Sequence, residues 1–254
     1  MKNQNIEGIH VYCDRWCERC TLTSRCAIYE DETNLSREEL DRNNEVFWER
    51  IGLNLVKAES FLKKVAAGKG IDLEAELKDP EFEERYQRKL DLGAESRKHP
   101  LALLSLEYSK LGRDWLKTQP GMLDHLEALK EELLLGVESQ EDAKKETAVI
   151  RDSLAVIQWY LVFIHVKLSR ALMGRQNDYS WDEKGEFPRD YDGSAKIAII
   201  AIDRSINAWS ALFEILPDEE DHFYRVLGML QKIRSMAVEE FPGAMSFVRP
   251  GFDG

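Results

Sequence analysis

Most of this chain repeats apolar residues at the spacing of an α-helix, and that periodicity limits the folds that it can adopt. After residue 34, apolar side chains recur three, four or seven residues apart in one segment after another. No segment alternates apolar and polar residues between the turn residues that bound strands. The sequence therefore predicts an all-α protein, a helical bundle of about six to seven helices.

Capping and helix-breaking residues divide this pattern into separate helices. Ser36 and Glu39 form a capping-box sequence, and the amphipathic helix that follows is expected to run to Gly68. Pro80 and Pro100 are expected to begin two further helices, because proline suits the first turn of a helix. The remaining helices are expected near residues 122–135, 139–174, 194–216 and 218–241.

Two helices, near residues 148–173 and 194–216, are apolar around most of their circumference. We expect them at the centre of the bundle, with the more charged helices around them. The segment 174–193 that joins them has about twenty residues, which is long for a compact bundle. Its aromatic residues are Tyr179, Trp181, Phe187 and Tyr191. We expect it either to pack on the bundle as a crossover or to offer a surface to an unknown protein partner.

Charge and hydropathy exclude several classes of partner. The chain has 35 basic and 47 acidic residues, a net charge of −12, which opposes nonspecific binding to nucleic acid. Its most apolar run, residues 154–164, is interrupted by Gln158 and is too short to span a bilayer, and the N-terminus lacks the apolar run of a signal peptide. We therefore expect a cytoplasmic protein that binds neither nucleic acid nor membranes.

The cysteines are all close to the N-terminus, in the pattern C-x3-C-x2-C-x5-C. A chain of 254 residues can bury a large enough core to fold without disulfides. In a reducing compartment, a dense group of cysteines more often binds metal or does redox chemistry. We therefore expect a metal-binding knuckle over residues 1–34, docked on a helical bundle over residues 35–254. The predicted metal ligands are Cys13, Cys17, Cys20 and Cys26.

The spacing of these cysteines bears on the identity of the metal. On a regular helix, Cys13 and Cys20 would share one face but lie about 10.5 Å apart along the axis. Zinc brings its sulfur ligands to within about 3.8 Å of one another, so it would require that helix to unwind. A [4Fe-4S] cluster spreads its ligands more widely, and compact cysteine runs are known to hold one. We expect a turn at residues 21–24, which brings in Cys26, and a [4Fe-4S] cluster, with Zn²⁺ as the alternative.

Four of the polar side chains on the central helices are candidates for binding a ligand: His165, Lys167, Arg170 and Arg204. Arg204 lies on an apolar face, and a buried guanidinium needs a partner, for which Asp152 and Asp203 are the candidates. One interpretation is an internal ion pair that fixes how the helices pack. The other is a pocket in which all four side chains bind a small polar or anionic ligand.

Three functions are consistent with these patterns. The first is an iron–sulfur protein with an electron-transfer, redox-sensing or regulatory role. The second is a zinc-stabilised helical module that binds a ligand or protein without redox activity, and the third is an enzyme with a site between the central helices. The sequence does not decide whether the protein is an enzyme, and it contains no P-loop, G-x-G-x-x-G or G-x-S-x-G motif.

Overall fold

The fold is all-α, as the periodicity predicted. The computed structural model describes residues 5–119, 121–137, 139–176 and 189–253. Within these ranges there are ten α-helices and no strand. The predicted count of about six to seven helices was wrong, because three helices, α1, α2 and α4, are too short to show a periodic pattern.

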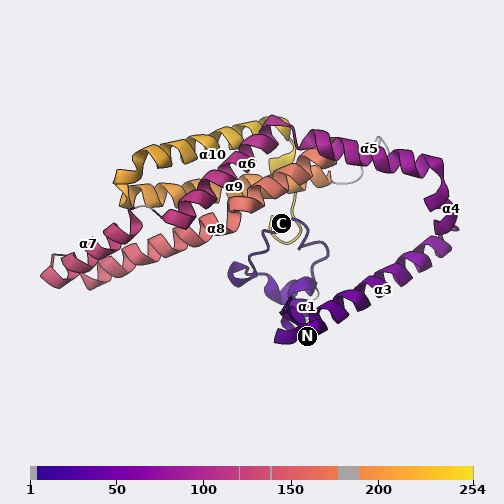
Figure 1. Ribbon diagram of the computed structural model, residues 1–254, viewed down its shortest axis with the longest axis horizontal. Coiled ribbons are helices and arrows are strands. Elements are labelled where there is room, and N and C mark those ends of the chain that lie inside the picture. Colours follow the sequence, from indigo (N-terminus) through magenta and orange to yellow (C-terminus); the bar gives the residue numbers. More distant parts are fainter. Residues whose placement is uncertain (1–4, 120, 138, 177–188, 254) are drawn as a thin grey trace. The chain divides into compact units, whose positions relative to one another are not determined.

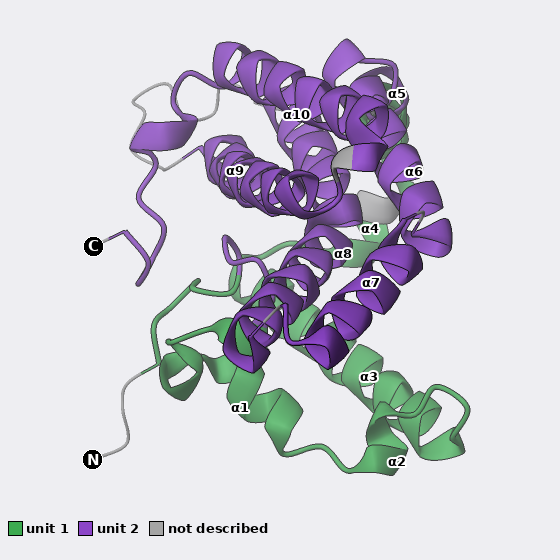
Figure 2. Cartoon of the chain, turned by 90° about the vertical axis from the view of Figure 1, so that its left-hand side faces the viewer, with its two compact units in different colours: residues 1–10, 17–92 green, residues 11–16, 93–254 purple. Residues whose placement is uncertain are grey.

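The packing of the helices divides the chain into two compact units, shown in Figure 2. Unit 1 comprises Met1–His10 and Cys17–Leu92, and unit 2 comprises Val11–Trp16 and Gly93–Gly254. The predicted boundary between a knuckle over residues 1–34 and a bundle over residues 35–254 stays a prediction.

Unit 1 contains the short helices and one long one. Its helices are α1 (Ala27–Thr33), α2 (Arg37–Leu40), α3 (Glu45–Gly68), α4 (Leu73–Lys78) and most of α5 (Pro80–Ser96). The predicted apolar face of α3 forms, yet it is largely uncovered: Leu55 is 66% exposed and Leu62 is 59% exposed.

The helix expected to start at Ser36 is interrupted after one turn. The capping box of Ser36 and Glu39 is present, and it begins α2. The chain then leaves the helix, and α3 starts only after Asn44, whose side chain accepts the N–H of Val46 at 3.0 Å. Polar side chains that bond to nearby backbone compete with a continuous helix in this way. The prediction of one unbroken helix from Ser36 to Gly68 was therefore wrong.

Unit 2 is a four-helix core with one additional helix. Its helices are α6 (Pro100–Thr118), α7 (Met122–Leu135), α8 (Gln140–Gln176), α9 (Asp190–Ile215) and α10 (Glu220–Glu240). Helix α8 packs on both α6 and α9, and α10 packs on α9 and α6 (Figure 1). Helix α7 packs mainly on α8.

The core of unit 2 is built on α9, as its apolar sequence predicted. The largest fully buried side chains include Trp209, Tyr108, Tyr160 and Phe223, and burying each side chain of this size contributes about 1.5–3 kcal/mol. The indole of Trp209 donates to the Tyr108 hydroxyl at 3.2 Å, so a polar atom in this core is satisfied. Helix α8 is buried along one face only, and Val166 on its other side is 54% exposed.

Helix α8 is the one described helix that could span a membrane by its length and composition, although no such segment was expected. By length and composition alone, it is long and apolar enough to cross a bilayer. In its most apolar window, 39% of the residues are buried inside the structure, and the core helix of a bundle has the same composition. The sequence argument considered only residues 154–164, whereas the whole of α8 is long and apolar enough. The absence of a membrane-spanning segment therefore stays a prediction.

The predicted partner-binding loop lies mostly outside the described residues. Residues 177–188, which include Tyr179, Trp181 and Phe187, are among those not described. Tyr191 lies in the first turn of α9, where it is buried and its ring centroid is 6.2 Å from that of Phe241. This aromatic residue is therefore part of the core.

Two leucines of α6 provide a test of the packing in unit 2. Leu101 is fully buried, whereas Leu103 is 53% exposed. We expect Leu101→Ala to lower the free energy of unfolding by about 2–5 kcal/mol, because it leaves a cavity. Leu103→Ala should change it by less than about 1 kcal/mol. Urea denaturation followed by circular dichroism measures both, and equal effects would contradict the described core.

Candidate metal-binding segment and its anchor on the bundle

The residues Val11–Trp16 form an anchor segment that packs on α8 and α9 within unit 2. The ring of Trp16 stacks on that of Trp159, with centroids 5.1 Å apart, and meets the edge of Tyr160 at 5.8 Å. The indole of Trp159 donates to the backbone carbonyl of Asp14 at 2.9 Å. Aromatic contacts of this kind add to the free energy gained by burying the rings.

The carboxylate of Asp14 is the polar centre of this contact. It accepts the hydroxyl of Tyr160 at 2.6 Å and Nη1 of Arg204 at 2.7 Å, and the Arg204 guanidinium also donates to the Tyr160 hydroxyl. The Asp14 side chain is 18% exposed, while that of Arg204 is 53% exposed. The Tyr160 bond is therefore better shielded from water than the ion pair.

The partner of Arg204 differs from both of the sequence-based candidates. Asp203 instead binds Arg234, at 2.6 Å, and Asp152 lies with Arg204 in the lining of a separate pocket. Asp14 is 190 positions from Arg204 in the chain, so helix periodicity could not have identified it. An ion pair is present, but Arg204 is half-exposed and the pair joins the anchor segment to α9. The interpretation of a buried ion pair between two helices was therefore wrong.

The pKa of Tyr160 follows from these contacts. Burial, followed by the hydrogen bond to Asp14, raises its pKa from 10.0 to about 12. A raised pKa in the folded state means that the hydroxyl stabilises the fold fully below pH 10. That contribution is lost as the pH rises toward about 12. At neutral pH, Tyr160 is therefore a protonated donor.

The other end of the anchor segment is held by a second set of polar contacts. Tyr12 donates its hydroxyl to Asp190 at 2.9 Å, and Arg170 binds both oxygens of Asp190, at 3.0 and 3.1 Å. The ammonium of Lys167 donates to the carbonyl of Val11 at 3.3 Å. Burial, together with the bond to Asp190, raises the pKa of Tyr12 to about 12.

Three of the four predicted ligand-binding residues therefore contact the anchor segment directly or through Asp190: Lys167, Arg170 and Arg204. The fourth, His165, has a different neighbour, because its Nδ1 lies 3.0 Å from the hydroxyl of Ser105 on α6. Burial lowers the pKa of His165, which favours the neutral ring at pH 7. Binding of a small polar or anionic ligand by these four residues stays a prediction.

Cys13 belongs to the anchor segment. Burial raises the pKa of its thiol, while the backbone N–H of Arg15, two residues later, and the charge of Arg15 oppose that change. Arg15 has a φ of 59°, in the left-handed region. A turn in this conformation therefore directs a backbone N–H toward the sulfur.

Cys17, Cys20 and Cys26 lie in unit 1, in a run of tight turns. A 3₁₀ turn spans Cys17–Arg19, a second spans Thr23–Arg25, and Cys26 precedes α1. The Sγ of Cys20 accepts the N–H of Leu22 at 3.4 Å. The turn expected at residues 21–24 is present.

The assumed helix through Cys13 and Cys20 is absent. The left-handed residue Arg15 and the short 3₁₀ turn at Cys17 take its place. The separation of about 10.5 Å that a helix would impose is therefore no objection to zinc. This argument for an iron–sulfur cluster over zinc was based on a wrong local structure.

The four thiols are suitable metal ligands by chemistry. None of them is in a disulfide, and all four are half-buried. Among the described residues, no group of three or more His, Cys, Asp or Glu side chains is arranged to hold a metal ion. The donor set fits a thiolate-bound metal, and binding would require the segment to close around it.

Sequence reasoning missed most of the residues that hold the anchor segment. These are Asp14, Trp159, Tyr160 and Asp190. The density of aromatic residues beside the cysteines was a usable signal, since Tyr12 and Trp16 both make ring contacts with unit 2. Nothing in a single sequence indicated which helix they would meet.

Comparison with protein-family models, with curated proteins and with solved structures gives no match to this chain. Its function must therefore be inferred from the chemistry of its own residues.

Replacement of Asp14 tests the anchor segment. Asp14→Asn removes the negative charge that Tyr160 and Arg204 share, and we expect it to lower the free energy of unfolding by about 1–3 kcal/mol. Tryptic cleavage after Arg15 should also become faster. Asp114→Asn is the control, because Asp114 is 72% exposed in a surface pair with Lys117, and it should cost less than about 0.5 kcal/mol. Equal stability of the two variants would contradict the described role of Asp14.

Gly193 provides a second test of the same contact. A Cβ at this position would lie 2.5 Å from two ring carbons of Tyr12 and 2.8 Å from Phe247. We expect Gly193→Ala to destabilise the protein by about 1–3 kcal/mol and to expose Tyr12 to solvent, which tyrosine fluorescence quenching measures. Gly228→Ala is the control, since nothing lies within 4 Å of a Cβ there. It should leave stability unchanged or raise it by up to about 1 kcal/mol.

Proposed function

We propose that the four cysteines bind a [4Fe-4S] cluster and that the protein transfers or senses electrons through it. The observation that supports this proposal most strongly is the concentration of every thiol in the chain within residues 13–26, with none in a disulfide. A chain of 254 residues can fold without disulfides, so four clustered cysteines are best explained by metal binding.

Local hydrogen bonds also favour thiolate chemistry in this segment. The sulfurs of Cys13 and Cys20 each accept a backbone N–H from the residue two positions later. A hydrogen bond donated to sulfur stabilises its charged form, which is the form that binds metal. Arg15, Arg19 and Arg25 add positive charge along the same stretch, which would offset the negative charge of a thiolate-bound metal.

The backbone around the cysteines is suited to rearrangement on metal binding. Short turns surround Cys17 and Cys20, so closure around a metal would break few helical hydrogen bonds. Small cysteine-rich segments commonly gain their final structure when the metal binds, because the binding free energy drives the ordering. The proposal therefore predicts that the metal orders residues 13–26.

The identity of the metal depends on the spacing of the ligands in the sequence. All four cysteines lie in one short run, which is typical of cluster-binding segments such as C-x2-C-x2-C-x3-C. Structural zinc sites more often use two ligand pairs separated by a longer stretch. We therefore place iron–sulfur first and a zinc-stabilised binding module second.

A bound cluster would supply one-electron transfer. The chain itself supplies the thiolates, the positive charge of the arginines and a fixed backbone on both sides of Cys13, where Tyr12 and Asp14 are hydrogen-bonded to unit 2. Rigid placement of one ligand reduces the reorganisation that accompanies a change of charge. This arrangement suits a redox centre that is carried on a stable helical scaffold.

Anaerobic purification tests the proposal. The protein should be brown, with broad visible absorption that dithionite bleaches and air or a mild oxidant restores. Cys17→Ser should remove most of the absorption and the bound iron, because it deletes a cluster ligand. Ser24→Ala, in the same segment, is the control and should retain both.

Two outcomes would contradict the iron–sulfur proposal. Colourless protein that contains one equivalent of zinc, lost in the Cys17→Ser variant, would establish the zinc-stabilised module instead. Protein that binds neither iron nor zinc after reconstitution would show that the four thiols serve another purpose.

A further inference from the structure

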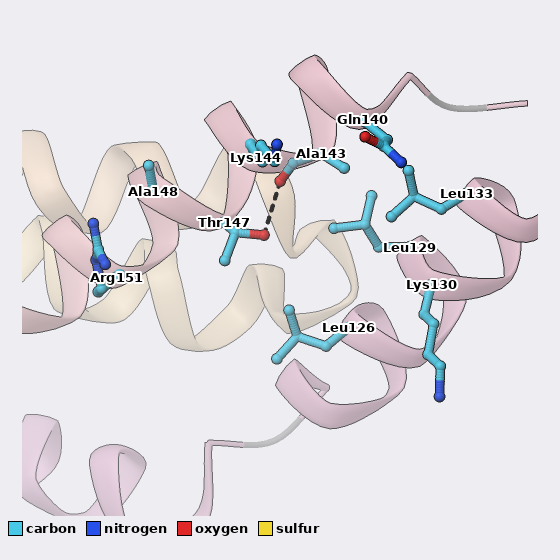
Figure 3. A pocket seen from close by; sticks show the side chains of 10 residues that line it. All are labelled: Leu126, Leu129, Lys130, Leu133, Gln140, Ala143, Lys144, Thr147, Ala148 and Arg151. Atoms are coloured by element: carbon cyan, nitrogen blue, oxygen red, sulfur yellow. Dashed lines mark hydrogen bonds between the residues drawn. The ribbon is translucent and has the colours of Figure 1, made fainter.

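A groove between α7 and the first half of α8 combines an apolar floor with basic side chains. The cavity has a volume of about 540 Å³ and lies entirely within unit 2. Leu126, Leu129 and Leu133 of α7 line it from one side (Figure 3). Its basic lining residues are Lys130, Lys144 and Arg151, and no acidic residue lines it. We call this feature the α7–α8 groove.

The basic residues of the groove have no ion-pair partner among the described residues. The contrast with Lys145 is informative, because Lys145 lies next to Lys144 in α8 and binds Glu141 at 2.9 Å and Asp142 at 3.4 Å. The chain has twelve more acidic than basic residues, from 47 against 35. Cations that lack a partner in such a chain are available to bind negative charge from another molecule.

Helix α7 packs mainly on α8. Gly121 and Gly136 flank it with φ values of 71° and 70°, and His125 of α7 contacts Glu146 of α8 at 2.5 Å. Apolar residues at its end are also uncovered, since Leu134 is 79% exposed and Leu135 is 78% exposed. Apolar surface of this kind beside a groove is typical of an interaction site.

We propose that the α7–α8 groove binds an acidic amphipathic helix of another protein. Two neighbouring helices leave a groove whose natural occupant is a third helix, which completes a small bundle. A helix also satisfies its own backbone hydrogen bonds, whereas an extended peptide finds no free strand edge in this helical groove.

The spacing of the cations defines the partner further. Lys144 and Arg151 are seven residues apart on α8, which is about 10.5 Å along the helix axis. A single carboxylate cannot reach both, but acidic residues two turns apart on a partner helix can. The partner helix therefore needs an apolar stripe of about three turns, flanked by Asp or Glu at seven-residue spacing.

Two synthetic peptides of about 14 residues test this proposal. Both carry the same helical stripe of leucines and a fluorescent label, but one has glutamates on its flanks and the other has lysines. We expect the glutamate peptide to bind the full-length protein with a Kd on the order of 10 µM in fluorescence anisotropy, and the lysine peptide to bind at least about ten-fold more weakly. Added salt should weaken the binding of the glutamate peptide.

Charge reversal at neighbouring positions provides the matched control. Lys144→Glu should weaken binding of the glutamate peptide by about five- to ten-fold, because it places like charges together. Lys145→Glu makes the same change one residue away, at a lysine that faces its own acidic neighbours, and should alter the Kd by less than about two-fold. Thermal melts of both variants show that the fold is retained. The cysteine variants should bind the peptide normally, so this test is independent of the metal.

Several outcomes would overturn the proposal. Equal binding of the two peptides, or equal effects of the two lysine substitutions, would show that the groove does not select its ligand by charge. Binding of dodecanoate that depends on Lys144, without binding of the glutamate peptide, would make the groove a site for anionic lipids. Self-association of the protein that Lys144→Glu abolishes and the peptide does not compete for would make a second copy of this chain the occupant.

Discussion

The hydrogen bond between Asp14 and Tyr160 is the contact on which the N-terminal part of unit 2 depends. Tyr160 is 1% exposed, so its hydroxyl has no access to bulk water and needs the carboxylate as an acceptor. The ion pair with Arg204 contributes less, because solvent screens its half-exposed guanidinium. Trp16 and Trp159 stack beside this pair. Burial of the aromatic rings and the hydrogen bonds to the Asp14 carboxylate therefore stabilise the same segment, Val11–Trp16.

The anchor segment links the proposed redox chemistry to the helical scaffold. Cys13 lies between Tyr12 and Asp14, whose side chains are both hydrogen-bonded to unit 2. A change in what Cys13 binds, or in its charge, acts on a backbone that cannot move freely on either side. Such a change would therefore strain the hydrogen bonds of Tyr12 and Asp14, which hold the backbone on either side of Cys13. A redox-sensing role would use this coupling, whereas a purely structural zinc site would not need it.

The sequence predicted local features better than contacts between distant residues. Pro80 and Pro100 begin helices, and Ser36 caps one, because these signals act within a single turn. The break before α3 was missed because Asn44 competes for backbone bonds inside an otherwise continuous apolar pattern. The acceptor for Tyr160 and Arg204 could not be predicted, because Asp14 lies in an irregular segment whose position no helical period determines.

The placement of positive charge distinguishes cations that stabilise the fold from those available to a partner. Arg204 and Arg170 each bind a carboxylate that also accepts a tyrosine hydroxyl, so both carboxylates are committed to internal contacts. Lys144 and Arg151 line an apolar groove without such a carboxylate. In a chain with a net charge of −12, surface acids are abundant enough to neutralise most cations. Cations left unpaired beside exposed leucines therefore mark a surface whose charge balance is completed by another molecule, and an acidic helix supplies both the charge and the apolar face.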